Sequence, residues 1–170
     1  MQRDAFDRFP RQEQSAARPS TAEVAQSLVR LDALARVEGR VSDGKPVVLF
    51  LCTHNAGRSQ LGAALLEHIA GDRYVAASAG VAPAETVNPA IAATVAEVGL
   101  DITDHVPRKV TAELVESADV VVAMKPGLEI PGTPKRLIEW SFPEPAAWDT
   151  DSVRPLREAV ADALREEFAN

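Results

Sequence analysis

Residues 46–59 read PVVLFLCTHNAGRS, and this stretch decides how the chain folds. Its first six residues form an apolar run as long as a buried strand, and residues 60–70 beyond it have the pattern of a helix. The polar loop between them lies where a strand runs into a helix N-terminus. Backbone N–H groups converge in such a loop and the helix dipole favours negative charge, so the loop forms a cradle for anions. The stretch therefore predicts an oxyanion site at the carboxyl end of a strand.

Two side chains of this loop are suited to covalent chemistry on a bound oxyanion. Cys52 stands at the strand end, where the cradle and the helix dipole favour the thiolate, the nucleophilic form of cysteine. Arg58 offers a planar, permanently charged fork for two substrate oxygens. The alternative for Cys52 is a small buried hydrophobic residue without a chemical role. We expect Cys52 and Arg58 to be catalytic.

The other loop residues have supporting roles available. Ser59, at the helix start, can donate its hydroxyl group to the thiolate. Gly57 permits a turn that brings backbone amides inward, and Asn55 tolerates the left-handed conformation and can brace the loop. His54 lies too near Cys52 along the loop to be assigned as its base and is expected at the rim. We expect the oxyanion to be bound by Thr53, His54, Asn55, Ala56, Gly57, Arg58 and Ser59.

The reaction also needs an acid, because an oxygen displaced from a tetrahedral oxyanion must be protonated. The candidate is Glu144 in the segment FPEP, residues 142–145, just past the fourth expected strand. Two prolines stiffen this loop, and Pro145 favours an extended conformation at Glu144. A solvated loop carboxylate is the alternative. Asp149 and Asp151 are further candidates for the acid, although Asp151 is better suited to cap the last helix.

Composition excludes several classes of protein. The chain has 170 residues and one cysteine, so it cannot form an internal disulfide. No apolar run is long enough to span a bilayer, and the N-terminus lacks a signal-peptide pattern, so we expect a cytoplasmic location with no membrane contact. The net charge of −7 argues against nucleic acid as a partner. Three scattered histidines and one cysteine predict no metal site.

Strand and helix patterns alternate after residue 45, which predicts an α/β catalytic domain over residues 46–170. We expect a four-stranded parallel sheet flanked by helices. The expected strands are residues 46–51, 73–78, 119–124 and 137–142, and the expected helices begin near Ser59, after Asn88 and Thr111, and at Val153. Residues 1–20 are polar and aperiodic and are expected to be flexible. Residues 21–45 predict an extra N-terminal helix and linker that cover the domain or make a homodimer contact.

The segment CTHNAGRSQ, residues 52–60, resembles the active-site loop of the low-molecular-weight protein tyrosine phosphatase superfamily, most closely its arsenate reductase branch. Residues 78–80 (SAG), 118–121 (ADVV) and 140–146 (WSFPEPA) resemble the same family. The resemblance covers about residues 46–168. It implies the low-molecular-weight phosphatase fold, with Cys52 as the nucleophile and arsenate or phosphate as the bound oxyanion.

The chain departs from this family at two places. Glu144 stands where the family usually has an aspartate before proline. Thioredoxin-coupled arsenate reductases carry two more cysteines near the end of the third strand, whereas residues 124–131 here read MKPGLEIP. The second thiol must therefore come from outside the chain. The resemblance to single-thiol enzymes implies mycothiol with a mycoredoxin-like protein, or else glutathione, as co-substrate, and no tightly bound cofactor.

Two other functions remain open on sequence. One is a protein tyrosine phosphatase with a phosphocysteine intermediate. Phosphatases of the family usually have proline where this chain has Gln60, and aromatic residues where it has Ala146-Ala147, although Trp140 and Trp148 could form an aromatic wall. The other is a non-catalytic module that binds oxyanions without turnover.

Overall fold

A computed structural model describes residues 45–169. The expected flexible segment, residues 1–20, lies outside the described residues. So does the predicted N-terminal helix and linker, residues 21–45, apart from Lys45, and with it the homodimer contact expected of that helix. None of the helices within residues 45–169 is both long and apolar enough to span a lipid bilayer.

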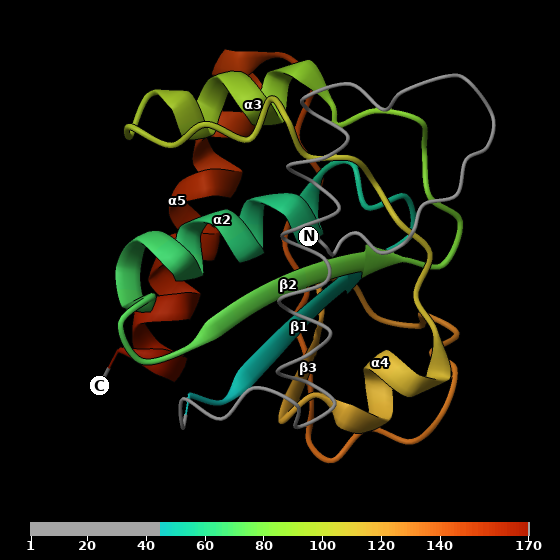
Figure 1. Ribbon diagram of the computed structural model, residues 1–170. Coiled ribbons are helices and arrows are strands. Elements are labelled where there is room, and N and C mark those ends of the chain that lie inside the picture. The colour runs from blue at the N-terminus through green and yellow to red at the C-terminus, as the bar shows by residue number, and fades with distance from the viewer. Residues whose placement is uncertain (1–44, 170) are drawn as a thin grey trace, which may run out of the picture.

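The described chain is built on a four-stranded sheet in the order β2-β1-β3-β4, with every neighbouring pair parallel (Figure 1). The strands are β1 (Val47–Cys52), β2 (Val75–Gly80), β3 (Val120–Ala123) and β4 (Leu137–Glu139). All six residues of β1 are buried, because it is a central strand covered on both faces. The predicted parallel sheet is confirmed.

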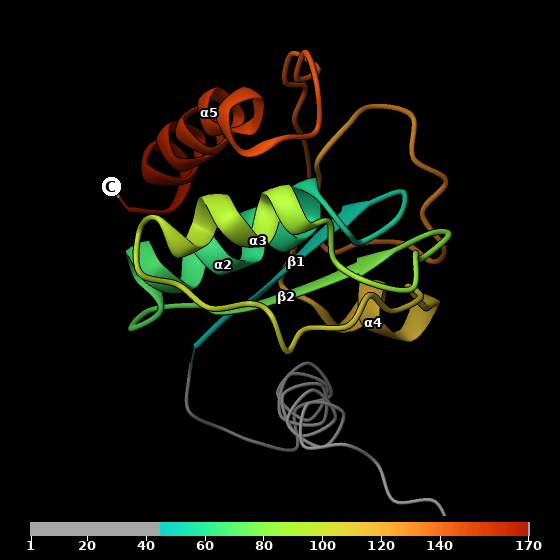
Figure 2. The ribbon, with the colours of Figure 1, turned by 90° about the horizontal axis from the view of Figure 1, so that it is seen from above.

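Helices cover the two faces of the sheet unequally. The helices are α2 (Arg58–Ala70), α3 (Pro89–Ala96), α4 (Ala112–Ser117) and α5 (Thr150–Phe168). Figure 2 shows α2, α3 and α5 on one side of the sheet and α4 on the other. Successive side chains of a strand point to opposite faces, so Phe50 packs in the core under α2, α3 and α5, and Leu49 packs in the smaller core over α4. By the same alternation Cys52 faces the side of α2.

Local signals in the sequence set the ends of two helices. The Asn88 side chain accepts a hydrogen bond from Ala90 N at 2.8 Å, and Pro89 is the first residue of α3. Gly99, with φ of 89°, follows this helix in the left-handed conformation that glycine adopts without strain. The Thr111 hydroxyl group caps α4. The predicted starts of α3 and α4, after Asn88 and Thr111, are confirmed.

The start of α5 differs from the sequence-based expectation. Asp149, rather than Asp151, accepts the N–H of Ser152 at 2.8 Å, so the helix begins at Thr150 instead of Val153. The hydrogen bond from this N–H lowers the pKa of the Asp149 carboxyl group, and the hydrogen bond from the Ser152 hydroxyl group makes a smaller contribution in the same direction. Pro155 consequently lies beyond the first turn of the helix.

The last strand is shorter than expected. Residues 137–142 alternate like a strand, yet β4 ends at Glu139. Trp140 N still donates to Ala123 O at 2.9 Å, but β3 itself ends at Ala123 and offers no further partner. Trp140 and Phe142 instead pack edge to face, with ring centroids 5.8 Å apart, against the core under α5. The apolar residues are therefore part of a loop that covers the core.

An ionic cluster joins α3 to α5. Glu97, at the C-terminal cap of α3, accepts hydrogen bonds from Arg154 at 2.7 Å and from Arg157 at 2.6 Å. These bonds lower the pKa of the Glu97 carboxyl group to about 2. Arg157 is buried and also donates to Thr94 O. The cluster ties the N-terminal half of α5 to the C-terminal end of α3.

Candidate active site

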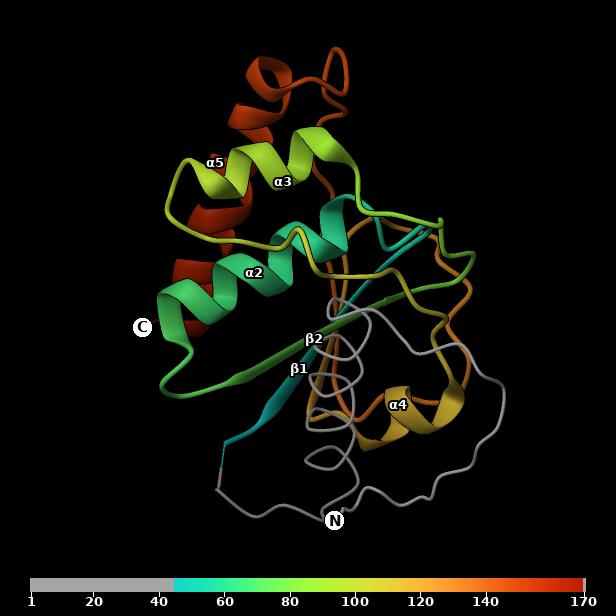
Figure 3. The same ribbon diagram turned by 45° about the horizontal axis from the view of Figure 1, so that its top comes forward.

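The site lies at the carboxyl end of β1, where Cys52 is the last residue of the strand and Arg58 is the first residue of α2. Figure 3 shows the N-terminal end of α2 at the same edge of the sheet as the ends of β1 and β2. Ligands of open parallel sheets bind at this edge. The predicted cradle is thus formed by residues 53–57, between the strand and the helix N-terminus.

The thiol of Cys52 is held in a short chain of buried hydrogen bonds. Its Sγ lies 3.0 Å from Ser59 Oγ, and Asn55 Nδ2 donates to the same Ser59 Oγ at 2.7 Å. Because the asparagine supplies the proton of that second bond, the Ser59 hydrogen remains available for the sulfur. The Ser59 hydroxyl group can therefore donate to the nucleophilic sulfur. The structure therefore places Ser59 where the sequence predicted it.

Asn55 has a φ of 51°, the only positive φ of a non-glycine residue between residues 45 and 169. It is fully buried, and two hydrogen bonds of its side chain and one of its carbonyl oxygen hold it in place. Its side chain donates to Ser59 and accepts Arg108 N at 3.0 Å, and its carbonyl oxygen accepts Gln60 Nε2 at 3.0 Å. The predicted left-handed conformation and bracing role are confirmed.

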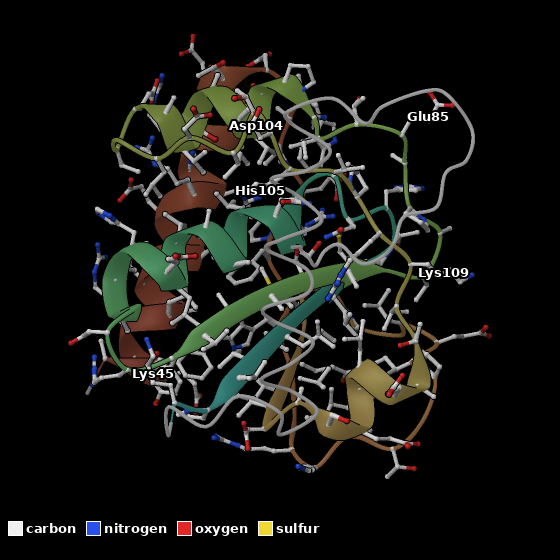
Figure 4. The ribbon with its side chains drawn as sticks, in the orientation of Figure 1. Lys45, Glu85, Asp104, His105 and Lys109 are labelled. Carbon is white, nitrogen blue, oxygen red and sulfur yellow. The ribbon has the colours of Figure 1, made fainter. Side chains whose placement is uncertain are left out.

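The bracing extends one residue further, to His105, which lies beside α2 (Figure 4). Its Nδ1 lies 3.2 Å from Gln60 Oε1, and the Gln60 amide in turn holds the carbonyl oxygen of Asn55. Burial lowers the pKa of the His105 imidazole, an effect that nearby carboxylates, first that of Glu67, only partly oppose. His105 therefore has a structural role, because it supports the glutamine that holds the loop.

Four carbonyl groups of the cradle are held by backbone hydrogen bonds. Cys52, Thr53, His54 and Ala56 each accept a backbone N–H from the segment 81–88, at 2.8–3.2 Å. In a planar trans peptide the C=O and the following N–H point in opposite directions. The amides that follow these four carbonyl groups consequently point away from the segment 81–88.

Gly80 is a site residue to which the sequence analysis assigned no role. It pairs with Cys52 across β1 and β2, and a Cβ atom on it would lie 2.8 Å from both Asn55 N and Thr53 O. The cradle therefore rests on a position where only glycine fits. The glycine is present in the SAG segment, residues 78–80, but its role depends on the register of β1 and β2, which are distant in sequence.

The loop opens into a pocket of about 360 Å³. It is lined by Cys52, Thr53, His54, Ala56, Gly57, Arg58, Asn88, Lys125, Glu144 and Trp148. His54 is exposed at the rim, as expected. Lys125, which the sequence analysis did not single out, joins the site because β3 ends beside β1.

Glu144 and Trp148 reach the pocket from the loop before α5. Glu144 forms an ion pair with Arg58, and its side chain is 67% exposed. The guanidinium of Arg58 also lies over the Trp148 ring, 5.6 Å from its centroid. The predicted acid is therefore at the pocket, whereas the alternatives are elsewhere: Asp149 caps α5 and Asp151 pairs with Arg154. Within residues 45–169, no three His, Cys, Asp or Glu side chains form a group that could hold a metal ion.

Comparisons with known proteins agree with this geometry. Residues 47–129 match the family described as low molecular weight phosphotyrosine protein phosphatase. An arsenate reductase from Bacillus cereus is 30% identical over 127 residues, covering 72% of this chain and 94% of that protein. The solved thioredoxin-dependent arsenate reductase of Corynebacterium glutamicum superposes with a TM-score of 0.72 at 32% identity, covering 87% of this chain and 72% of the other. The arsenate reductase of Archaeoglobus fulgidus superposes with a TM-score of 0.62 at 28% identity, covering 72% of this chain and 99% of the other.

Proposed function

Because this chain belongs to the low molecular weight phosphotyrosine protein phosphatase family, in its arsenate reductase branch, we propose that this enzyme reduces arsenate with electrons from an external thiol. The observation that carries the proposal is the single cysteine of the whole sequence, seated in an oxyanion cradle. One sulfur can form a covalent bond to arsenic but cannot form an internal disulfide. The two electrons that convert arsenate to arsenite must therefore come from thiols outside the chain.

The first step is attack of the Cys52 thiolate on arsenic, which forms an S–As bond and releases one arsenate oxygen as water. Arg58 and the amides of residues 53–57 hold the other oxygens, and Ser59 stabilises the thiolate before attack and after its release. Glu144 supplies the proton for the leaving oxygen. Arsenic is still pentavalent in this adduct.

Two external thiols complete the reduction. The first displaces Cys52 from arsenic, which frees the enzyme and leaves a thiol–arsenic adduct. The second attacks the sulfur of that adduct, so that a disulfide forms and the S–As bonding pair stays on arsenic as arsenite. We assign mycothiol to the first step and a mycoredoxin-like protein to the second, with glutathione and a glutaredoxin as the alternative pair. No tightly bound cofactor takes part.

The test supplies the purified full-length chain with arsenate and each reductant in turn: mycothiol with mycoredoxin, glutathione with glutaredoxin, and thioredoxin alone. The thioredoxin arm is included because the similar Corynebacterium glutamicum protein is described as thioredoxin-dependent. We expect arsenite formation only where a low-molecular-weight thiol is present, and fastest with mycothiol. Arsenite formation with thioredoxin alone at the same rate would contradict the adduct with a small thiol, and no arsenite in any arm would overturn the proposed function.

A second function is favoured by one observation, the position of Trp148. Its ring stands at the pocket mouth, 3.5 Å from where a Cβ on Gly57 would lie, and could contact the ring of a phosphotyrosine. Trp140, the other candidate for an aromatic wall, packs on Phe142 instead. An aryl phosphate is therefore included as a further substrate. Turnover of the aryl phosphate at ordinary enzymatic rates without arsenite would favour the phosphatase, and oxyanion-dependent thermal stabilisation without turnover of either substrate would favour a binding module.

Replacing Glu144 by glutamine is expected to lower kcat for arsenate about tenfold without raising KM. This loss lies below the range of about 10²–10⁴ typical of a general acid, because the side chain is largely exposed and water can replace it. KM is not expected to rise, because the variant also removes the carboxylate that competes with arsenate for Arg58. The measurement is arsenite formation at saturating thiol. Glu139→Gln, an exposed carboxylate of β4, is the matched control, and an unchanged kcat in Glu144→Gln would assign the proton transfer to solvent.

A further inference from the structure

A second cation, Lys125, borders the pocket. Lys125 follows Met124, whose N–H donates to Leu51 O at 2.8 Å, so parallel pairing sets Lys125 beside the first residues of the cradle. Its Nζ donates to Thr53 Oγ1 at 3.3 Å, and both residues line the pocket with Cys52. The ammonium group is therefore held over the cradle by a hydroxyl group one residue from the nucleophile.

The two cations of the pocket are compensated differently. Arg58 forms an ion pair with Glu144, whereas Lys125 forms no ion pair with a carboxylate among residues 45–169. Its bond to Thr53 is long and has a neutral acceptor, so it is easily exchanged for a bond to an anion. The long, flexible lysine stem lets the ammonium move by the small distance required.

We propose that Lys125 is a second cationic ligand of the oxyanion and makes the site selective for doubly charged anions. The inference rests on the proposed function, since it names the charge state of the substrate bound there. Arg58 and the cradle amides hold one side of a tetrahedral anion. Arsenate and phosphate at neutral to alkaline pH carry a further negative charge, and a compact ammonium at the rim pairs with it. A singly charged tetrahedral anion gains much less from this second cation.

The test measures anion binding without chemistry, by titration calorimetry on full-length Cys52→Ser protein at a mildly alkaline pH. Inorganic phosphate, mainly doubly charged there, is compared with perchlorate, a singly charged tetrahedral anion. Adding Lys125→Met is expected to raise the Kd for phosphate about tenfold and the Kd for perchlorate less than about twofold. Lys125→Arg, which keeps the charge, is expected to stay within about threefold of the parent. Lys135→Met removes an equal charge before β4, at the opposite end of the sheet, and is expected to change neither Kd.

Phosphate binding that survives Lys125→Met unchanged, or a loss equal for phosphate and perchlorate, would overturn the inference. No thiol is present in this experiment, so its result is separate from the arsenite assay. Arsenite formation combined with phosphate binding that does not depend on Lys125 would leave the proposed function standing and remove this inference. If phosphate binding depends on Lys125 but the protein forms no arsenite, the role of Lys125 in anion binding stands and the proposed function is removed.

Discussion

Replacing Cys52 with serine is expected to abolish arsenite formation, with kcat lower by about 10⁴-fold or more, while oxyanion binding remains. This is the loss found when the nucleophile is removed from an enzyme that works through a covalent intermediate. A serine hydroxyl group at this position stays protonated at neutral pH, and the chain has no other thiol to take over. The measurement is arsenite formation with mycothiol and mycoredoxin at saturating arsenate.

The same variant tests whether the loss is chemical rather than structural. Cys52 is 5% exposed and serine is slightly smaller, so the fold and the bond to Ser59 are expected to persist. Arg58 and the cradle amides are untouched, and phosphate should still raise the midpoint of thermal unfolding. Residual arsenite formation above about a tenth of the parent rate would mean that Cys52 is not the nucleophile. Loss of both activity and phosphate stabilisation would point instead to a collapsed cradle.

The parts of the site that could be predicted are those whose causes are local in sequence. Asn55 takes the left-handed conformation because its short polar side chain can bond to Ser59 within the same loop. The strand end at Cys52 and the helix start at Arg58 follow from the change of periodicity between them. The cradle between β1 and α2 can therefore be predicted from local sequence alone, without knowledge of tertiary contacts.

The parts that could not be predicted depend on pairing between distant segments. Lys125 belongs to the site only because β3 lies beside β1. Strand β4 ends earlier than its apolar residues suggested because β3, its one neighbour in the sheet, ends at Ala123. The choice of Asp149 over Asp151 as a cap is a competition between two residues of equal propensity. Local sequence does not contain the information that decides these cases.

Replacing Gly80 with alanine is expected to lower kcat/KM for arsenate about 100-fold. The substitution adds a single methyl group, at a residue that does not line the pocket. The new Cβ would lie 2.8 Å from Asn55 N and from Thr53 O. Both are backbone atoms, so no side-chain rotation relieves the contact and the cradle itself must move. A displacement of about 1 Å in a positioning element can cost about 10²-fold in rate. Crowding of this kind is also expected to lower the free energy of unfolding by about 1–3 kcal/mol.

The control for this substitution is Gly99→Ala, which separates stability from loop geometry. Gly99 has a φ of 89°, and a Cβ atom on it would meet no other atom within 4 Å, so alanine there is strained by its backbone alone. We expect that variant to lose about 1–2 kcal/mol of unfolding free energy, measured in urea, with kcat/KM unchanged. Equal losses of activity in the two variants would mean that Gly80 acts only through global stability. A loss confined to Gly80→Ala, together with slower alkylation of Cys52, would establish that the end of β2 sets the shape of the cradle and the reactivity of its thiol.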